Sequence, residues 1–461
     1  MADRVVLVYG DRQYCRADLD ALTDRMAAEL HRRGVVAGRR VALMSSNRPE
    51  FVAAVLAIWR LGAAVVLLSP AWKQTEVQHA LELTEPVAAV GDHDILAALM
   101  PMLHLDEPLP DGSVDPVTAD GEAVLVFSSG TTGMPKAVRH THHGLRAAIA
   151  QWREALGLSD SDRMQIMTPP SHILGLLNIL TALDAGVWLR LHPRFDIDTM
   201  LSHIQDDRIT VEMAVAPIAL AMAAHPDLES YDLSSLRYIM WCATPVTPSV
   251  AHEVTRRTGV QWLTASGSTE VVLFSCNEIG GSLDSVGRAA PGVQIRILAE
   301  SGDVLGPGNE GEIQVRSEAA MAGYLPDTET AVMFDDGWYR TGDIGYLDAD
   351  GRLYITDRAK EMIKVRGFQI APAEIEAVLL GHPAVADCAV FGVPDAANGE
   401  AVVAAVARSG QVEADELSAL VADRLAAYKR LSNVVFVPEI PRLPSGKVLR
   451  RVLKERRWTS V

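Results

Sequence analysis

The sequence predicts an α/β protein with three parts: a large N-terminal region of stacked α/β subdomains, a β-rich subdomain, and a small α+β C-terminal domain. Over the first half of the chain, short apolar runs alternate with amphipathic helical patterns, which is the rhythm of a mostly parallel, covered sheet. From Gly280 onward, glycine and proline become frequent and short alternating strands appear. After residue 357 a separate pattern of helix, two strands and helix begins.

The hydrophobic periodicity locates the individual elements. In the N-terminal region it predicts helices at residues 18–33, 49–61 and 75–83, a further helix ended by Gly157, and strands at 41–44, 64–68, 87–90, 124–127, 186–191 and 209–214. In the β-rich subdomain, about residues 285–357, it predicts strands at 294–298, 311–316 and 351–356. In the C-terminal domain it predicts helices at 374–379 and 413–428 and strands at 388–393 and 402–407.

Composition limits the class of protein. The chain has 461 residues, of which 49% are hydrophobic, so it can bury a large core. Its net charge of −17 argues against a nucleic-acid partner. No apolar run approaches the roughly 20 residues of a membrane span, and the N-terminus lacks the apolar core of a signal peptide. The cysteines Cys15, Cys242, Cys276 and Cys388 are scattered without metal-binding spacing, so we expect ordinary buried thiols and a cytoplasmic protein.

The strongest chemical signal follows the strand expected at residues 124–127. The segment is rich in hydroxyls and glycines and ends in a lysine: Ser128, Ser129, Gly130, Thr131, Thr132, Gly133 and Lys136. Glycines let backbone N–H groups approach oxygen closely, hydroxyls donate further bonds, and the lysine adds a charge. A simple polar turn needs only one or two such residues. The segment therefore predicts a polyphosphate site, although it lacks the spacing of a Walker A loop.

Ser-Ser-Gly-Thr-Thr-Gly-Met-Pro-Lys resembles the signature loop of the adenylate-forming superfamily, which includes AMP-forming acyl-CoA synthetases, peptide-synthetase adenylation domains and luciferases. Four further motifs in the family's order extend the resemblance from about residue 10 to 455. The resemblance implies ATP, Mg²⁺ and CoA as cofactors. It also implies a nucleotide- and acyl-binding region of residues 1–357 and a mobile catalytic domain of residues 358–461, with a hinge near Lys360.

The resemblance also assigns residues on the nucleotide side. Thr269 would bond the α-phosphate, and Glu270 would hold Mg²⁺, a cation that prefers carboxylate and phosphate oxygens. Taken alone, a glutamate in the first turn of a helix is explained by the helix dipole. In a chain that also carries a phosphate loop, the role of metal ligand explains Glu270 better. The remaining positions on this side are Cys242, Ala243 and Thr244 near adenine, Ser266 and Gly267 beside them, Asp343 on the ribose hydroxyls, and Arg358 on ribose and phosphate.

On the acyl and thiol side, the resemblance assigns His172 to the border between the acyl pocket and the pantetheine tunnel. Amino-acid-activating relatives carry aspartate there, so His172 argues against an α-amino acid. Substrate contacts are also expected at Gly175, Trp241 and Gly267, and Trp241 has the alternative of a packed core residue. Gly367 would line the tunnel. Lys447 would bridge the carboxylate and the α-phosphate and neutralise developing charge.

The apolar residues around these positions suggest the kind of acid. The expected lining consists of Ile173, Leu174, Leu176 and Met240. Such a lining favours an aryl or bulky alicyclic acid.

We therefore expect an acyl-CoA ligase that activates a carboxylic acid as its acyl-adenylate and transfers the acyl group to CoA. Ser266 replaces an aromatic residue of the family pattern, and Cys242 and Ala137 replace glycines. These departures leave open an enzyme that performs only the thioester step on a preformed acyl-adenylate. Transfer to a carrier-protein thiol, cooperation with a partner enzyme, and an inactive nucleotide-binding protein also stay open.

Overall fold

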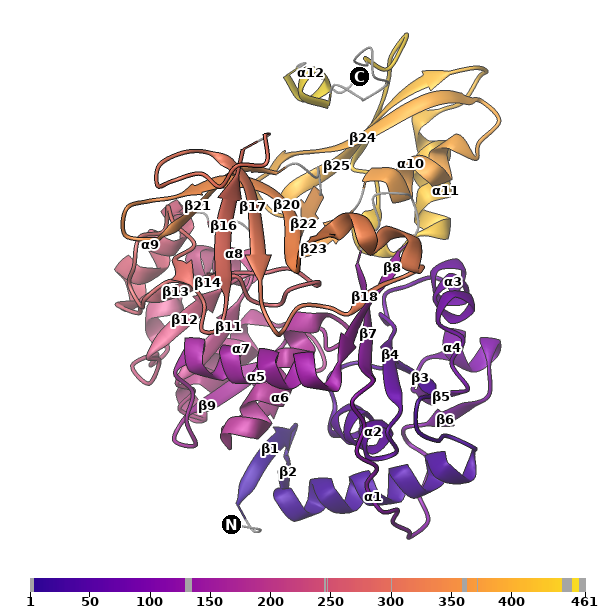
Figure 1. Cartoon of the computed structure of the whole chain (residues 1–461), viewed down its shortest axis with the longest axis vertical. Coiled ribbons are helices and arrows are strands. Elements are labelled where there is room, and N and C mark those ends of the chain that lie inside the picture. The colour runs from indigo at the N-terminus through magenta and orange to yellow at the C-terminus, as the bar shows by residue number, and fades with distance from the viewer. Residues whose placement is uncertain are drawn as a thin grey trace. The chain divides into compact units, whose positions relative to one another are not determined.

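The computed structural model describes residues 4–128, 135–243, 246, 248–299, 301–358, 363–370, 372–441 and 450–455. The chain forms two compact units (Figure 1). Unit 1 contains Met1–Pro70, Ala80–Phe127 and Ala137–Ala359; unit 2 contains Ala71–His79, Ser128–Lys136 and Lys360–Val461. The mixed α/β architecture predicted from the sequence is confirmed. The expected domain limits and the hinge at Lys360 stay predictions.

The first sheet of unit 1 has seven strands in the order β18-β8-β7-β4-β3-β5-β6. Their bounds are β3 (Arg40–Met44), β4 (Ala64–Leu67), β5 (Ala88–Gly91), β6 (Met102–His104), β7 (Glu122–Ser128), β8 (Lys136–Thr141) and β18 (Gly323–Leu325). β3 pairs in parallel with β4 and β5, and β4 pairs in parallel with β7. These pairings show the parallel sheet expected from the alternating pattern. The strands are also buried on both faces, as is usual in parallel sheets.

The second sheet of unit 1 has nine strands in the order β15-β14-β13-β12-β11-β9-β10-β1-β2. Their bounds are β1 (Val5–Tyr9), β2 (Arg12–Cys15), β9 (Arg163–Ile166), β10 (Trp188–Leu191), β11 (Val211–Ala214), β12 (Tyr238–Trp241), β13 (Trp262–Ser266), β14 (Ser275–Cys276) and β15 (Arg288–Ala289). The sequence analysis missed the hairpin of β1 and β2. Gly10, with φ +56°, turns this hairpin, and β1 joins the sheet by pairing in parallel with β10.

Helices cover both sheets. They are α1 (Arg16–Arg32), α2 (Pro49–Arg60), α3 (Gln74–Thr84), α4 (Asp94–Leu99), α5 (His142–Leu156), α6 (Ile173–Ala185), α7 (Ile197–Asp206), α8 (Ala216–Ala224) and α9 (Pro248–Thr258). α1 starts two residues earlier than predicted, because Asp18 accepts the N–H of Cys15 as the third helical residue of a capping box. The strand expected from residue 186 begins at Trp188. Gly186, in the left-handed conformation, instead ends α6, which the sequence analysis missed.

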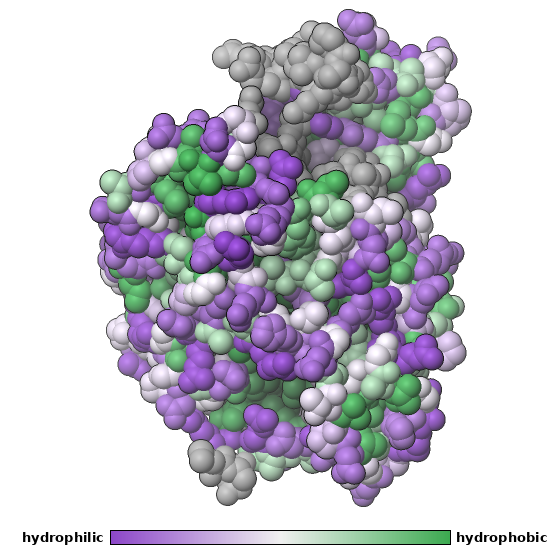
Figure 2. Space-filling view, viewed as in Figure 1, coloured by the Kyte–Doolittle hydropathy of each residue, from purple (hydrophilic) through white to green (hydrophobic). Residues whose placement is uncertain are grey.

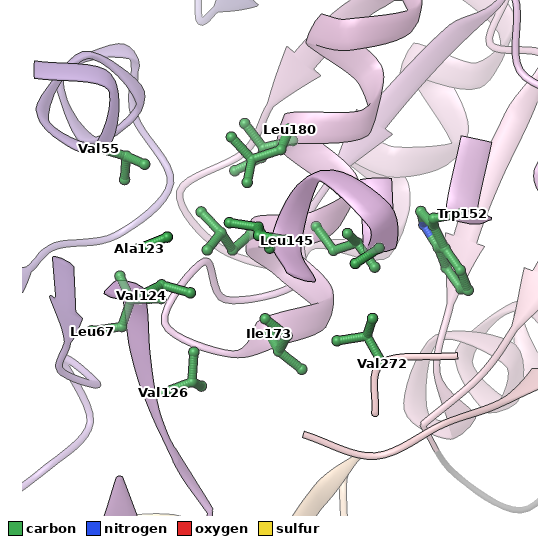
Figure 3. Packing of buried hydrophobic residues seen from close by; sticks show 14 of the residues in the cluster. Val55, Leu67, Ala123, Val124, Val126, Leu145, Trp152, Ile173, Leu180 and Val272 are labelled. Atoms are coloured by element: carbon green, nitrogen blue, oxygen red, sulfur yellow. The ribbon is translucent and has the colours of Figure 1, made fainter. Parts of the chain in front are cut away.

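The main core of unit 1 joins the two sheets through α5 and α6. Figure 3 shows Leu145 of α5 and Ile173 of α6 pointing toward Val124 and Val126 of β7. Farther along α5, the fully buried Trp152 donates its indole N–H to Asn178 Oδ1 at 2.8 Å. A buried indole with a partner for its N–H packs without loss of a hydrogen bond, so this contact links α5 to α6 within the core.

A third sheet, of five strands, forms the β-rich part of unit 1. It comprises β16 (Gln294–Leu298), β17 (Gly311–Arg316), β19 (Phe334–Asp335), β20 (Trp338–Leu347) and β21 (Leu353–Arg358). The strands predicted at 294–298 and 311–316 are confirmed. The strand predicted at 351–356 lies two residues later, because residues 348–351 form the turn between β20 and β21.

Among its described residues, unit 2 contains a second five-stranded sheet, the first part of α3, and three further helices. Its strands are β22 (Ile363–Val365), β23 (Phe368–Ile370), β24 (Val385–Asp395), β25 (Gly399–Arg408) and β26 (Asn433–Phe436), and its helices are α10 (Pro372–Leu380), α11 (Ala414–Arg424) and α12 (Arg450–Glu455). The helix and two strands predicted at 374–379, 388–393 and 402–407 are present with longer bounds, and β26 was not predicted.

α11 ends four residues before the predicted position, and a buried ion cluster explains the early end. Lys429 Nζ lies 2.7 Å from Glu76 Oε1 and 2.6 Å from Glu374 Oε2, and all three side chains are almost completely buried. A short 3-10 turn over Ala427–Lys429 carries the lysine to this position. Burial alone would lower the pKa of Lys429, but Tyr428 and the two carboxylates outweigh it and raise that pKa. The lysine therefore stays charged in unit 2.

The surface of unit 1 is mixed in character. Figure 2 shows hydrophilic residues interspersed with smaller groups of hydrophobic residues on the visible face. Of the four cysteines, Cys242 and Cys388 are buried as expected, whereas Cys15 and Cys276 are only half-buried. Among the helices of the described part of the chain, none combines the length and the apolar character that crossing a membrane requires.

Candidate active site

Several predicted site residues of unit 1 lie at one edge of the nine-stranded sheet. β9, β11, β12 and β13 run parallel to one another, and Trp241 of β12 is in register with Thr264 of β13. Their carboxyl ends therefore meet at the same edge, which is where open α/β sheets bind ligands. This arrangement brings the segments that begin at Met167, Cys242 and Gly267 to neighbouring positions along the edge.

The segment after β12 contains a tightly packed cysteine and a strained alanine. The Cys242 thiol is buried, and burial, with a smaller effect of Cys276, raises its pKa to about 12, so the thiol stays protonated and is a poor nucleophile. Ala243 has φ +63°, a conformation that costs a residue with a Cβ about 1–2 kcal/mol. Backbone strain of this kind is often found at ligand-binding positions. Trp241 has no exposed surface and packs against Trp262 at a centroid distance of 5.2 Å.

The turn after β13 carries Gly267, Thr269 and Glu270. A Cβ on Gly267 would lie 2.2 Å from the carbonyl oxygen of Val272, so the turn closes only with glycine at this position. The Ser268 hydroxyl accepts the N–H groups of Glu270 and Val271 at 3.2 and 3.1 Å. The chain thereby folds back on itself in a turn that contains the two predicted site residues, Thr269 and Glu270.

Two neighbouring segments hold this turn in place. The buried His140 of β8 bonds the carbonyl oxygen of Thr269 through Nε2 at 2.8 Å. Burial lowers the pKa of His140, so the imidazole is neutral and donates its Nε2 proton. The N–H of Met321 donates to the carbonyl oxygen of Glu270 at 2.8 Å. The side chain of Glu270 also has a partner, because Tyr324 Oη donates to its Oε1 at 2.8 Å. β8 and β18 of the first sheet thus fix the turn of the second sheet.

His172 precedes α6 as its N-terminal flanking residue, with extended backbone angles. Gly175 permits a close approach in the first turn of α6, since a Cβ there would lie 2.2 Å from the carbonyl oxygen of Pro169. The neighbouring Ser171 hydroxyl is buried and has no hydrogen-bond partner within the part of the chain that is described. A buried hydroxyl of this kind is suited to a polar group of a ligand or to water.

The residues expected to line the acyl pocket belong mainly to the core. Ile173, Leu176 and Met240 are buried in the main cluster, and Leu174 packs against it half-buried. Their contact with a substrate stays a prediction.

Asp343 and Arg358 are brought together by the third sheet. They are directly opposite each other in the register of β20 and β21. Asp343 is largely buried, and its N–H donates to Thr341 Oγ1 at 3.0 Å. A carboxylate beside the position of an arginine is suited to hydroxyl groups such as those of a ribose.

Unit 2 carries the described ends of the phosphate loop and the predicted tunnel glycine. Ser128 ends β7, and Lys136, which is buried, begins β8. Gly367, with φ +86°, and Arg366, with φ +51°, form the two-residue turn of the hairpin between β22 and β23. Two successive positive φ angles are typical of a type I′ turn. The turn therefore gives Gly367 a conformational reason to be glycine, in addition to its predicted place in a tunnel.

The remaining predicted positions lie outside the described residues: Ser129, Gly130, Thr131, Thr132, Gly133, Thr244, Lys360 and Lys447. For Arg358 the backbone alone is described. The sequence analysis missed His140 and Tyr324, which hold the turn of Thr269 and Glu270. A histidine within the buried strand that follows the phosphate loop is a signal that could have pointed to the first of them.

Comparison with known proteins gives consistent results along the whole chain. The family model described as AMP-binding enzyme matches residues 1–325, and the model described as AMP-binding enzyme C-terminal domain matches residues 374–447. A 4-coumarate–CoA ligase of Pinus taeda is 33% identical over 99% of this chain and 92% of the relative. 4-Coumarate–CoA ligase 5 of Oryza sativa subsp. japonica is 35% identical over 95% of this chain and 88% of the relative.

Two solved structures are similar to this chain over nearly its whole length. A double mutant of o-succinylbenzoate CoA synthetase (MenE) from Bacillus subtilis, bound with a product analogue, has a TM-score of 0.91 and 30% identity over 98% of this chain and 96% of that one. The amide bond synthetase McbA from Marinactinospora thermotolerans has a TM-score of 0.90 and 30% identity over the same shares of the two chains.

Proposed function

The chain belongs to the AMP-binding enzymes and is an AMP-forming acid–thiol ligase, and we propose that it activates an aromatic carboxylic acid as its acyl-adenylate and transfers the acyl group to the thiol of CoA. The observation that carries the proposal is the edge of the nine-stranded sheet. There, the turn of Thr269 and Glu270 and the segments of Cys242 and His172 follow neighbouring parallel strands.

In the proposed first half, the carboxylate of the acid attacks the α-phosphorus of ATP and pyrophosphate leaves. Glu270 would hold Mg²⁺, and it fits this role because Mg²⁺ is commonly bound by one or two carboxylates together with phosphate oxygens. The bound cation would neutralise phosphate charge. Thr269 would bond the α-phosphate, Asp343 the ribose hydroxyls, and Lys447 the charge that develops in the transition state.

In the proposed second half, the CoA thiol attacks the acyl carbonyl and AMP leaves. His172 would border the acyl group, and the turn of Gly367 would line the path of the thiol. The intermediate divides one difficult substitution into two easier ones, because AMP is a better leaving group than oxide.

The proposed substrate class rests on two features. The curated relatives are named for 4-coumarate and one structural neighbour for o-succinylbenzoate, and both acids contain an aromatic ring. The residues that the sequence analysis expects beside the acyl group, Ile173, Leu176 and Met240, are apolar and buried, and they would offer no charged side chain to a substrate ammonium group.

The experiment that tests this function is an acid panel with ATP, Mg²⁺ and CoA, followed by mass spectrometry of CoA esters. We expect an aromatic acid to give its thioester together with AMP and pyrophosphate. Lys447→Ala should reduce acyl-adenylate formation by roughly 10²- to 10³-fold, as expected for one preorganised charge, and should spare thioester formation from supplied acyl-adenylate. Equal loss of both steps would contradict the assigned role of Lys447. Failure of every aromatic acid would contradict the proposed substrate class.

The second candidate function is a thioester step without adenylation. Three positions favour it: Ser266 in place of an aromatic residue, and Cys242 and Ala137 in place of glycines. Cys242 and Ala137 are both buried, so their side chains occupy space that glycines would leave. Loss of an aromatic platform costs about 1–3 kcal/mol of base stacking. Brisk pyrophosphate release with ATP and acid would exclude this candidate. Its absence, together with acyl-CoA formation from synthetic acyl-adenylate, would support it.

A further inference from the structure

Three hydroxyl side chains, those of Tyr324, Tyr339 and Ser268, and the carboxylate of Glu270 form a connected polar circuit in unit 1. Tyr324 of β18 donates to Glu270 Oε1 at 2.8 Å. Tyr339 of β20 lies close enough to interact with both Tyr324 and Ser268. Ser268 Oγ accepts the backbone N–H of Glu270 at 3.2 Å, which returns the circuit to the residue where it began. The circuit joins the turn after β13 to strands of two other sheets.

The carboxylate of Glu270 decides which hydroxyl donates and which accepts in each contact of this circuit. An ionised carboxylate only accepts hydrogen bonds, so Tyr324 must donate its single proton to Glu270. The contact between the two phenols then requires Tyr339 to donate to Tyr324 Oη. The contact of Tyr339 with Ser268 requires the serine to donate in turn. Ser268 can do so, because its oxygen already accepts two backbone N–H groups and its own proton is not used by them.

The circuit is buried, so the loss of any one of its contacts would leave a polar group unsatisfied away from water. Tyr324 and Tyr339 are 4% and 3% exposed. A buried phenol that loses its partner bears a desolvation cost, so the two hydroxyls favour a single arrangement. Bonds that point in one direction polarise one another, which strengthens the last bond, the one to Glu270.

The bond to Oε1 leaves the other carboxylate oxygen available. Glu270 is partly exposed, and within the described part of the chain Oε2 accepts no hydrogen bond. We propose that Tyr324, supported by Tyr339, is a positioning residue that fixes the Glu270 carboxylate so that it binds the divalent cation of the nucleotide. This inference rests on the proposed function, in which Glu270 meets Mg²⁺. Partners that orient a metal-binding carboxylate typically change metal affinity by 10- to 100-fold when they are removed.

The test uses the full-length protein and measures cation binding directly. Mn²⁺ serves as the probe, and its free concentration is followed by electron paramagnetic resonance in the presence of a non-hydrolysable ATP analogue. Tyr324→Phe, which removes one hydroxyl and keeps the ring, should weaken Mn²⁺ binding by about 10-fold or more. Tyr346→Phe is the matched control, because Tyr346 lies on the same strand as Tyr339 and stacks on Tyr354 outside the circuit. It should bind Mn²⁺ as the wild type does.

A double variant separates positioning from a general structural role. Because Tyr339 acts through Tyr324, Tyr339→Phe should weaken Mn²⁺ binding when made alone and should add almost nothing in the Tyr324→Phe background. The melting temperatures of all variants are measured in the absence of cation and nucleotide. Additive effects of the two substitutions on Mn²⁺ binding would overturn the inference. Mn²⁺ affinities that fall in step with the melting temperatures across all variants, the Tyr346→Phe control included, would overturn it too.

The outcomes distinguish this inference from the proposed function. If the wild type binds Mn²⁺ with the nucleotide analogue and Tyr324→Phe binds it equally well, the positioning role is overturned and the ligase function stands. If the wild type binds no Mn²⁺ with the analogue, the proposed adenylation is overturned and the positioning role falls with it. Weaker binding in Tyr324→Phe, with unchanged thioester formation from supplied acyl-adenylate, supports both.

Discussion

Replacing Glu212 with glutamine should change how the stability of unit 1 depends on pH. Glu212 lies in the middle of β11, between the two strands whose ends lead to His172 and Cys242, and it is almost completely buried. Gln165 Nε2 donates to its Oε2 at 2.7 Å, and the N–H of Met213 donates to its Oε1 at 3.2 Å. Burial raises the pKa of Glu212 to about 8, and these two hydrogen bonds oppose the rise only in part.

The magnitude and sign follow from the two protonation states. In the unfolded chain the carboxyl group loses its proton near its ordinary pKa of 4.5, whereas the folded protein keeps it up to about 8. Between these values the folded state binds more protons, so the free energy of unfolding falls as the pH rises. The slope is about 1.4 kcal/mol per pH unit, and the total approaches roughly 5 kcal/mol. Above the folded pKa the loss is complete and the slope from this group vanishes.

Glutamine has no such titration, so Glu212→Gln should gain stability relative to the wild type as the pH rises. The gain should amount to about 3 kcal/mol between about pH 5.5 and 8. The assay is urea unfolding followed by tryptophan fluorescence, repeated at several pH values. Glu253→Gln is the control, because Glu253 lies exposed on α9 and its pKa is lowered by Arg256, so no gain with pH is expected there. A stability difference between Glu212→Gln and wild type that stays constant with pH would refute the reasoning.

Three further substitutions test other parts of the structure. Gly267→Ala should cost about 1–3 kcal/mol and lower pyrophosphate release, because its Cβ would meet a carbonyl oxygen at 2.2 Å, whereas Gly121→Ala, with open space around it, should change neither thermal stability nor pyrophosphate release. Lys429→Met should lower the urea stability of unit 2 by about 3–5 kcal/mol, since it leaves buried carboxylates unpaired, and adding Glu374→Gln should recover part of the loss. Gly367→Leu should cost about 1–2 kcal/mol in thermal unfolding and Gly367→Asn much less, because asparagine tolerates positive φ angles. Equal stability of the paired variants would contradict each of these assignments.

Much of the fold was predictable because it follows from local patterning. The strands of the parallel sheets are short apolar runs separated by helical stripes, so β3, β4 and β5 appear within one or two residues of their expected positions. The end of α5 was equally clear, because Gly157 adopts the left-handed conformation that ends a helix. The early end of α11 was not predictable, because it depends on the ion cluster of Lys429, whose partner Glu76 is more than 350 positions away.

The site residues, too, were predictable where their signal is local in the sequence and were missed elsewhere. Positions in the motifs, such as Thr269 and Glu270, were identified because their residue types are close in sequence. The residues that hold these positions were missed. His140 and Tyr324 lie 129 and 54 positions from their partners, and only the pairing of β8 with β18 brings them to the turn. A single sequence contains no local signal for contacts of this kind.

In the proposed first half-reaction, the carboxylate of the acid attacks the α-phosphorus of ATP. The most direct measurement is isotope transfer, with the aromatic acid found in the panel labelled with ¹⁸O in both carboxylate oxygens and incubated with the full-length protein, ATP, Mg²⁺ and CoA. Mass spectrometry of the nucleotide product should find one ¹⁸O atom in AMP for each thioester formed, and none in pyrophosphate. Unlabelled AMP, or label in inorganic phosphate with ADP as the nucleotide product, would contradict the account.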